Sequence, residues 1–340
     1  MTRMTTMADV AKRAGVSIMT VSRVVNNSGY VKPSTRQKVL AAMQELNYVP
    51  KGQQSSPHDT WMLIVPDITN PFFTFIARGM EDVARKHGFR VFIANTDEDL
   101  QKEQEYVQMC LDYQVRGALV VPVGDPSREN IVRLTEHQVP FVLIDREIEG
   151  LDADLVKGDI RETSRRLVEH LLDLGHERIA AVVGPLHSAS SRERLDGYRD
   201  ALLHKGLPVD ESLIFTAPMT RDMDASFVDA LVGRSDAPTA LFLGNMFQYA
   251  HIVRRLRGLG LSIPHDISVV SFGNTDDLAS VDSLATAAVQ PAYNYGSLGA
   301  QLLLERIEGV RKTSTRIVLH SEMVVRSSTA PPPVRMTKKR

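Results

Sequence analysis

Basic side chains are concentrated in the first 52 residues, where their charges could pair with phosphate groups. This segment contains eight lysines and arginines but only two acids, Asp9 and Glu45, whereas the whole chain has 40 basic and 41 acidic side chains. The remainder of the chain is therefore acidic. A compact basic segment attached to an acidic body is typical of a protein that binds nucleic acid through one part only.

The side-chain arrangements that catalysis requires are absent from the sequence. The chain contains no GxGxxG, Walker or GxSxG motif, and its ten histidines show no spacing suited to a metal site. Its one cysteine, Cys110, falls in a helical pattern over residues 101–113 and excludes an internal disulfide bond. The sequence thus predicts no enzyme, no metal site and no cofactor, and a buried structural thiol at Cys110.

The elements that must position the basic side chains are two short helices joined at Gly15. Apolar residues form one face on each helix, at positions 10, 11 and 14 and at positions 21, 24 and 25. Glycine readily adopts the positive φ that a tight turn needs. The pattern predicts a helix-turn-helix, in which the second helix lies in the major groove of DNA.

Short polar residues mark the expected starts of three helices. Thr6, Ser17 and Ser34 are suited to cap them, and the third helix runs to about residue 46. An apolar stripe on the third helix would close a three-helix core. The next segment, residues 51–60 (KGQQSSPHDT), is polar and interrupted by Gly52 and Pro57, so we expect a linker there.

Beyond Trp61, short apolar runs alternate with amphipathic helical segments. The helical segments are residues 72–87, 162–174, 193–205 and 249–259, and the apolar runs are residues 62–65, 90–94, 118–122, 141–144, 179–183, 213–216, 240–243 and 267–272. Nearly continuous aliphatic runs between helices predict parallel sheets covered on both faces. About 270 residues exceed a single core, so we expect two α/β lobes, with ligands beyond the carboxyl ends of the strands.

Several motifs resemble the lactose-repressor-type (LacI) family of transcriptional regulators, in that family's order. Residues 7–26, 35–39 and 45–50 resemble its DNA-binding headpiece. The matching segments further along are residues 65–73, 143–146, 170–176, 184–185, 194–198, 266–270 and 289–291. The resemblance implies a small all-α helix-turn-helix headpiece and an α/β core like that of periplasmic binding proteins, built from two doubly wound parallel-sheet lobes.

The resemblance also implies domain boundaries and partners. We expect the headpiece at residues 1–50, a linker at 51–60, one effector-binding lobe at 61–160 with 291–328, the other lobe at 161–290, and a disordered tail at 329–340. Paired headpieces of a homodimer would bind a near-palindromic DNA operator. A small-molecule effector between the lobes would change operator affinity by favouring one lobe arrangement.

By the same resemblance, side chains along and beside the second helix contact DNA. Ile18 and Met19 would meet base edges through thymine methyl groups, and Arg23 would bind a guanine through two hydrogen bonds. Alternatively, Ile18 packs only on the headpiece core. Hydroxyl groups would reach the phosphate backbone. The expected set is Thr6, Ser17, Ile18, Met19, Thr20, Ser22, Arg23, Asn26, Tyr30, Thr35 and Tyr48.

The linker departs from the family pattern. Family members usually carry a hinge helix whose leucine wedges into the minor groove, but the residues between Gly52 and Pro57 include no leucine. This segment is also too short for a stable helix. We therefore expect weaker DNA kinking and looser coupling between core and headpiece.

The resemblance places an effector site at strand ends. The expected residues are Asn70, Phe72, Phe73, Asp145, Arg146, Arg194, Asn245 and Gln290. Simpler roles stay open for some of them. One of Phe72 and Phe73 would be ordinary core, Asn70 could cap the helix that follows Pro71, and Asp145 could pair with Arg146.

Two departures bear on the effector. Met246 and Gly273 occupy positions where the family carries aspartates that grip sugar hydroxyls. Each lost charge-assisted hydrogen bond is worth about 1.5–3 kcal/mol. Either the ligand is less hydroxylated than an unmodified sugar, or it is anionic; we favour a sugar acid, a phosphorylated sugar or a related anion.

Other functions remain open at this point. The chain could be a regulator that has lost effector binding, or a cytoplasmic small-molecule-binding module of the periplasmic type. We see neither a signal peptide nor an apolar run long enough to span a membrane. The sequence favours a cytoplasmic, DNA-binding transcriptional regulator, a repressor of carbohydrate or related catabolic genes.

Overall fold

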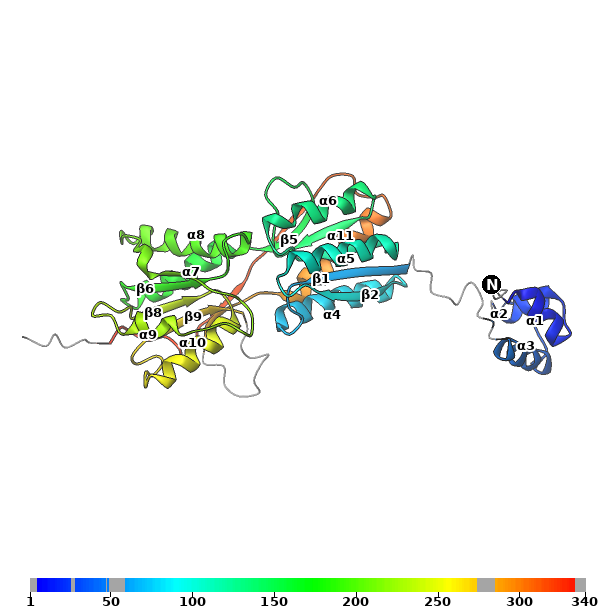
Figure 1. The fold of residues 1–340 in the computed structure, drawn as a ribbon, viewed down its shortest axis with the longest axis horizontal. Coiled ribbons are helices and arrows are strands. Elements are labelled where there is room, and N and C mark those ends of the chain that lie inside the picture. Colours follow the sequence, from blue (N-terminus) through cyan, green and yellow to red (C-terminus); the bar gives the residue numbers. More distant parts are fainter. Residues whose placement is uncertain (1–4, 26–27, 47, 49–58, 274–284, 334–340) are drawn as a thin grey trace, which may run out of the picture. The chain divides into compact units, whose positions relative to one another are not determined.

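The computed structural model describes residues 5–25, 28–46, 48, 59–273 and 285–333 (Figure 1). The chain divides into two compact units, Met1–Asp59 and Thr60–Arg340. The expected DNA contact Asn26, the residues of the linker up to His58 and the last seven residues of the expected tail lie outside the described residues.

In the part of the first unit that the structure describes, three helices surround a small apolar core. They are α1 (Met7–Ala14), α2 (Ile18–Val25) and α3 (Pro33–Glu45). The core joins Val10, Val21 and Val39, one from each helix, all fully buried. Gly15 adopts φ 67° between α1 and α2, so the predicted turn is confirmed.

The helix starts agree with the sequence in two of three cases. Thr6 caps α1 in a reciprocal capping box with Asp9, and the Ser17 hydroxyl accepts a hydrogen bond of 3.2 Å from the Thr20 amide. The expected cap at Ser34 is wrong, because α3 already begins at Pro33 and has no side-chain cap. Proline needs no cap partner, since it has no N–H and its φ suits the first helical position.

The second unit begins with a six-stranded parallel sheet in the order β11-β5-β4-β3-β1-β2. Its strands are β1 (Thr60–Val65), β2 (Arg90–Asn95), β3 (Gly117–Val120), β4 (Phe141–Ile144), β5 (Asp154–Gly158) and β11 (Arg316–Leu319). Helices α4 (Pro71–Lys86) and α11 (Ala292–Ile307) cover one face, and α5 (Leu100–Asp112) and α6 (Arg128–Glu136) cover the other.

Side chains of β1 alternate between these two faces. Trp61 and Leu63 pack with α4 and α11, whereas Met62 and Ile64 pack with α5 and α6. Cys110 of α5 is fully buried among the latter, and burial raises the pKa of its thiol to about 12. Both sheet faces are therefore apolar, as the aliphatic runs predicted.

Helices α4 and α11 cross at two glycines. A Cβ added to Gly296 would lie 1.9 Å from the Ile76 carbonyl oxygen, and one added to Gly79 would lie 2.1 Å from the Tyr293 carbonyl oxygen. Only glycine permits this separation of the two backbones.

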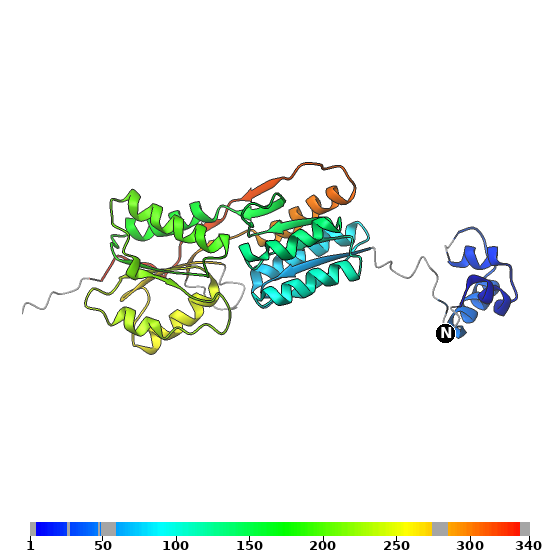
Figure 2. The ribbon, with the colours of Figure 1, turned by 45° about the horizontal axis from the view of Figure 1, so that its top comes forward.

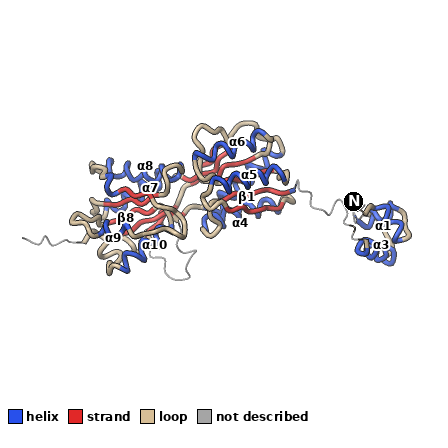
Figure 3. Tube along the Cα trace, viewed as in Figure 1, coloured by secondary structure: helices blue, strands red, loops and turns tan. Residues whose placement is uncertain are grey.

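A second six-stranded sheet has the order β12-β10-β9-β8-β6-β7. Its strands are β6 (Ile179–Val183), β7 (Ile214–Thr216), β8 (Ala240–Leu243), β9 (Ser268–Phe272), β10 (Thr286–Val289) and the antiparallel β12 (Glu322–Val324). Helices α7 (Ile160–Asp173) and α8 (Ala189–His204) cover one face, and α9 (Phe227–Val232) and α10 (Met246–Gly258) cover the other (Figures 2 and 3).

Within the described residues, the chain passes between the two lobes three times, after β5, β10 and β11. Asp159 connects the first and third passages. Its amide donates to the Leu319 carbonyl at 3.0 Å, and its carboxylate accepts from the Ser321 amide at 3.0 Å. The lobes are thus joined by neighbouring, hydrogen-bonded segments.

The carboxyl-terminal boundaries differ from the expected ones. Residues 291–328 do not all belong to the first lobe, because β12 pairs with β10 in the second sheet. The expected tail also begins too early, since the Ala330 amide donates to the Ser268 hydroxyl at 3.0 Å and the Ala330 carbonyl lies 2.8 Å from the His176 ring. No helix of the described residues has the length and apolar character needed to cross a membrane.

Candidate DNA-reading helix and effector pocket

Helix α2 buries one side and exposes the residues expected to read bases. Val21 and Val24 lie in the headpiece core, whereas Ile18 and Met19 are 53% and 66% exposed. Arg23 is exposed as well. Ile18 is not part of the headpiece core, so the geometry favours the base-reading hypothesis over simple packing.

The expected backbone contacts occupy different surroundings. Tyr30 is largely exposed, whereas the Tyr48 ring is buried in the headpiece core. The Thr6 hydroxyl donates to Asp9 at 2.6 Å, and the hydroxyls of Ser17 and Thr20 bond to each other at 2.9 Å. Some of these hydroxyls therefore serve helix capping, which the sequence also predicts for Thr6 and Ser17.

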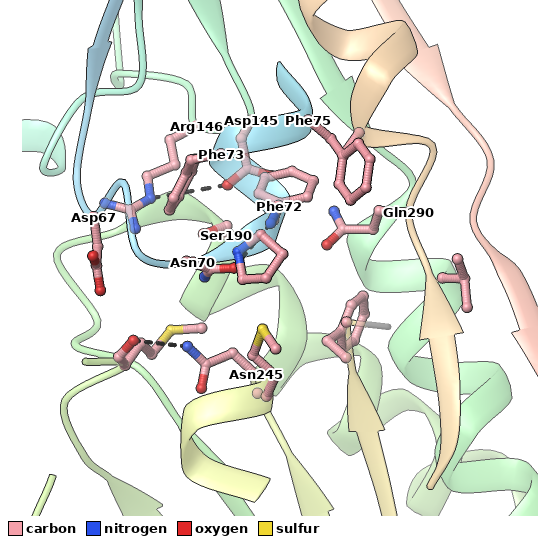
Figure 4. Close-up of a pocket in the computed structure, with 18 of the residues that line it drawn as sticks. Asp67, Asn70, Phe72, Phe73, Phe75, Asp145, Arg146, Ser190, Asn245 and Gln290 are labelled. Carbon is pink, nitrogen blue, oxygen red and sulfur yellow. Dashed lines mark hydrogen bonds and ion pairs between the residues drawn. The ribbon is translucent and has the colours of Figure 1, made fainter. Parts of the chain in front are cut away.

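The second unit contains a cavity of about 270 Å³ between its two lobes. All eight residues of the expected effector set line it. Figure 4 labels all of them except Arg194. They come from separate segments that end or follow strands, and α8 contributes Arg194. The carboxyl ends of the strands of both sheets therefore meet at this cavity.

Arg146 lies at the first-lobe side of the pocket and is only 5% exposed. Its terminal nitrogens form two hydrogen bonds to Glu98, at 2.7 and 2.8 Å, and one nitrogen also donates to the Pro122 and Val123 carbonyls. Burial acts to lower the pKa of Arg146, but the carboxylates of Glu98, Asp145 and Glu103 together outweigh it and the pKa is raised. Glu98 thus neutralises this guanidinium.

Glu98 was missed by the sequence reasoning, although it follows β2 at the carboxyl edge of the sheet. It reaches Arg146 from a turn in which Asp97 and Glu98 both have positive φ, at 52° and 58°. Asp145 contributes less than expected to the pairing with Arg146, because its carboxylate lies 4.0 Å from the arginine Nε.

Arg194 is 4% exposed and differs from Arg146 in its partners. One terminal nitrogen donates to the Ser190 carbonyl at 3.0 Å, and the guanidinium carbon lies 4.6 Å from the centre of the Phe272 ring. Its Nε has no hydrogen-bond partner, and no carboxylate of the described residues lies within 4 Å of the group. Burial lowers the pKa of Arg194.

Asn70 and Asn245 each hold a helix start at the pocket. The Asn70 side chain accepts from the Phe72 amide at 3.1 Å, so its predicted cap of α4 is confirmed. Asn245 caps α10 through the Gln248 amide at 2.9 Å and donates to the Met219 carbonyl at 2.8 Å. Each amide therefore has a structural role in addition to its place in the pocket wall.

The two phenylalanines divide between core and pocket. Phe73 is 5% exposed and belongs to the first-lobe core, although it also touches the cavity. Phe72 is half-buried, with its ring 5.3 Å from that of Tyr295. Gln290 donates to the Tyr295 hydroxyl at 3.1 Å. Phe72 is thus the better placed of the two to contact a ligand.

A helix-turn-helix unit and a two-lobed core with a pocket between the lobes define a class of ligand-controlled, DNA-binding regulators. Residues 6–51 match the model of the bacterial regulatory proteins of the lacI family, and residues 168–329 match that of the periplasmic binding protein-like domain. The chain belongs to the LacI family of DNA-binding transcriptional regulators.

Relatives match along nearly their whole length. The chain is 34% identical over 334 residues to the HTH-type transcriptional regulator DegA of Bacillus subtilis (strain 168), which covers 96% of this chain and 98% of that protein. It is 33% identical over 329 residues to catabolite control protein A of Priestia megaterium, covering 95% and 99% of the two chains.

Solved structures share this architecture. The complex of the transcriptional regulator CelR with cellobiose matches with a TM-score of 0.73 and 30% identity, over 95% of this chain and 99% of that one. The lac repressor dimer bound to operator and the anti-inducer ONPF matches with a TM-score of 0.79 and 26% identity, over 96% and 100%.

Proposed function

We propose that the protein represses carbohydrate or related catabolic genes from the cytoplasm, without catalytic activity, by binding a near-palindromic operator as a homodimer. An effector in the interlobe pocket controls operator affinity. The observation that carries this proposal is the pocket itself, whose wall is built from both lobes. A ligand that contacts both lobes favours one lobe arrangement over another.

The headpiece supports the DNA-binding part of the proposal. Ile18 and Met19 present exposed apolar groups at the start of α2, and Arg23 presents an exposed guanidinium on the same helix. We assign thymine methyl contacts to the first two residues and a guanine contact to Arg23. Tyr30 and Thr35 are assigned to the phosphate backbone.

The edge of the first-lobe sheet supports dimerisation. Strand β2 is an edge strand, and Phe92 and Ile93 on it are 51% and 50% exposed. Exposed apolar edge strands are unfavourable in a monomer unless a partner covers them. We assign this edge to a second copy of the chain, since the matching lac repressor is a dimer on its operator.

The pocket and the relatives support a small polar effector. The matching CelR structure contains cellobiose, and another family member of known structure contains ribose. A sugar, sugar acid or phosphorylated sugar would meet the polar groups of Asp145, Arg146 and Arg194 and the aromatic ring of Phe72.

A gel shift on the DNA upstream of the protein's own gene tests this function. We expect a defined operator to be bound, and at least one catabolite to change the affinity. Removal of the exposed guanidinium of α2 by Arg23→Ala should weaken operator binding. Equal affinity for operator and unrelated DNA would contradict the proposal.

A further inference from the structure

The pocket wall combines charged groups with apolar side chains. Three buried polar atoms on its wall have no hydrogen-bond partner: Oδ1 of Asp145, Nε of Arg146 and Nε of Arg194. These atoms are themselves shielded from solvent, but buried polar groups are nearly always paired, so their residues mark the part of the wall where polar groups of a ligand are expected. One of these atoms can only accept a hydrogen bond and two can only donate.

Apolar side chains line the pocket from both lobes. Phe72 and Phe75 come from the first lobe, Met219 and Met246 come from the second, and Gly273 contributes no side chain. Asn245, labelled in Figure 4, uses its oxygen for the Gln248 amide and its nitrogen for the Met219 carbonyl. A ligand rich in hydroxyl groups would leave several of them facing methionine side chains, at a cost in free energy.

The two arginines differ in the charge that they can offer. Glu98 forms a bidentate pair with Arg146, so that guanidinium needs no further anion. Arg194 lies over a phenylalanine ring and touches no carboxylate of the described residues. A buried cation without a close counter-ion is unfavourable until an anion arrives. The anion-binding group of the pocket is therefore Arg194.

The charge of the ligand follows from the acids on the same wall. Asp67, Glu98 and Asp145 all line the pocket. A phosphate monoester, with close to two negative charges, would be repelled by these acids while only one cation lacks a counter-ion. A single carboxylate matches Arg194 without that repulsion. The open oxygen of Asp145 then requires a donor, which a hydroxyl group supplies.

Building on the effector-controlled function proposed above, we propose that the effector is a hydroxy carboxylic acid with an apolar body. Its carboxylate binds Arg194, its hydroxyl group donates to Asp145, and its apolar body packs against Met219 and Met246. The proposed effector class therefore excludes phosphorylated sugars and neutral sugars.

Isothermal titration of the full chain with five probes tests the ligand class. Mandelate carries all three features; 1-phenylethane-1,2-diol lacks the charge, phenylacetate lacks the hydroxyl, gluconate lacks the apolar body, and glucose 6-phosphate carries a phosphate. We expect mandelate to bind at least about tenfold more tightly than each of the others, because each loses one favourable contact. Equal or tighter binding of gluconate or glucose 6-phosphate overturns the proposal.

Two pocket variants assign the contacts. Arg194→Met keeps the side chain's length, and it should weaken mandelate binding about tenfold or more while leaving binding of the neutral diol unchanged. Asp145→Leu, whose side chain cannot accept a hydrogen bond, should abolish the preference for mandelate over phenylacetate. Arg199→Met is the matched control, since Arg199 is on the same helix but is paired with Glu211 outside this pocket.

Thermal unfolding and operator binding of each variant show that it is folded. A folded Arg194→Met that binds mandelate like the wild type overturns the proposal. Operator binding also separates this proposal from the one it rests on. If the upstream DNA is bound but none of the probes is, the ligand class is wrong and the regulator stands; if mandelate binds but no upstream DNA does, the regulator is wrong.

Discussion

The Arg192 guanidinium of α8 lies 2.7 Å from the Asp125 carboxylate, so an ion pair joins the second lobe to the first. The next residue, Glu193, pairs with Lys157, near the carboxyl end of strand β5 in the first lobe. Arg194 then turns into the pocket. Three consecutive residues of one helix thus contact the other lobe twice and the effector pocket once, and an effector on Arg194 acts on the helix that holds the lobes together.

A double-mutant cycle of Arg192→Met and Asp125→Asn measures the interlobe pair. Both side chains are about one-third exposed, so solvent screening should limit their coupling to about 1 kcal/mol or less. The free energy of unfolding of the four proteins gives this value. The exposed pair of Arg199 and Glu211 within the second lobe is the control. Coupling well above that range would mean that the pair is held rigidly.

Base reading by α2 can be tested by changes in the protein and by changes in the DNA. Ile18→Ser should weaken operator binding about fourfold, in line with about 0.8 kcal/mol for each buried methyl-sized group. Uracil in place of the contacted thymine should weaken the wild type similarly and leave the variant unaffected. Gel shifts with both DNAs provide the measurement. An operator indifferent to every thymine-to-uracil replacement would rule out methyl contacts.

A glycine-to-alanine substitution should have opposite effects at the crossing of α4 and α11 and at a glycine outside that crossing. Gly296→Ala should destabilise the protein by about 3 kcal/mol or more, because its Cβ would overlap the Ile76 backbone. Gly258→Ala, at the end of α10 with nothing within 4 Å, should stabilise it by about 0.5–1 kcal/mol. Chemical denaturation distinguishes the two. Equal effects would contradict the close crossing.

Dimerisation through β2 predicts that Phe92→Asp yields monomers. A charge at this exposed apolar position would be buried without a partner in the proposed interface. Val318→Asp is the control, because Val318 is 47% exposed on β11, at the opposite edge of the same sheet. Sedimentation velocity should show a dimer for the wild type and the control. A dimeric Phe92→Asp would place the interface elsewhere.

His176 predicts a loss of stability on mild acidification. Burial lowers the pKa of this ring below its ordinary value of 6.5, and the ring bonds to Thr239 and to the Ala330 carbonyl. The stability gained from the neutral ring is complete above pH 6.5 and is lost as the pH falls through the folded-state pKa. The slope from one proton cannot exceed about 1.4 kcal/mol per pH unit.

Denaturation of the wild type and of His176→Gln between about pH 8 and about pH 5.5 tests this slope. The variant should start less stable and lose less on acidification. Burial also lowers the pKa of His170, which adds a slope of the same sign in both proteins. Glu103 acts oppositely, because burial raises its pKa and so favours the folded state as the pH falls. If the free energy of unfolding fell equally with pH in both proteins, His176 would be excluded as a source of the loss.

Much of the fold could be predicted because its strands are aliphatic runs. Strands β4, β6 and β8 match the predicted ranges residue for residue. Strand β5 was missed because it contains Asp154 and Lys157, which are buried with ion-pair partners outside the strand: Arg306 for Asp154, and Glu147 and Glu193 for Lys157. No local pattern reveals such partners. Strand β12 was also missed, because its place in the second sheet depends on the chain's third passage between the lobes.

The site was easier to predict than the balance of its charges. The family resemblance supplied the eight expected residues, and all eight line one pocket, where the carboxyl ends of the strands converge. The resemblance does not say which acid meets which base. Glu98 reaches Arg146 because two successive residues adopt positive φ, which the sequence does not specify. Arg194 consequently differs from Arg146 in a way that only the structure shows.

The three passages between the lobes also bear on how the protein is made. Helix α11 and strand β11 complete the first lobe, yet they are synthesised after the strands of the second lobe from β6 to β10. On the ribosome, the α4 surface that Gly296 later meets must therefore stay uncovered while most of the second lobe emerges. The first lobe begins first and finishes nearly last, so the nascent chain exposes this apolar face for most of translation.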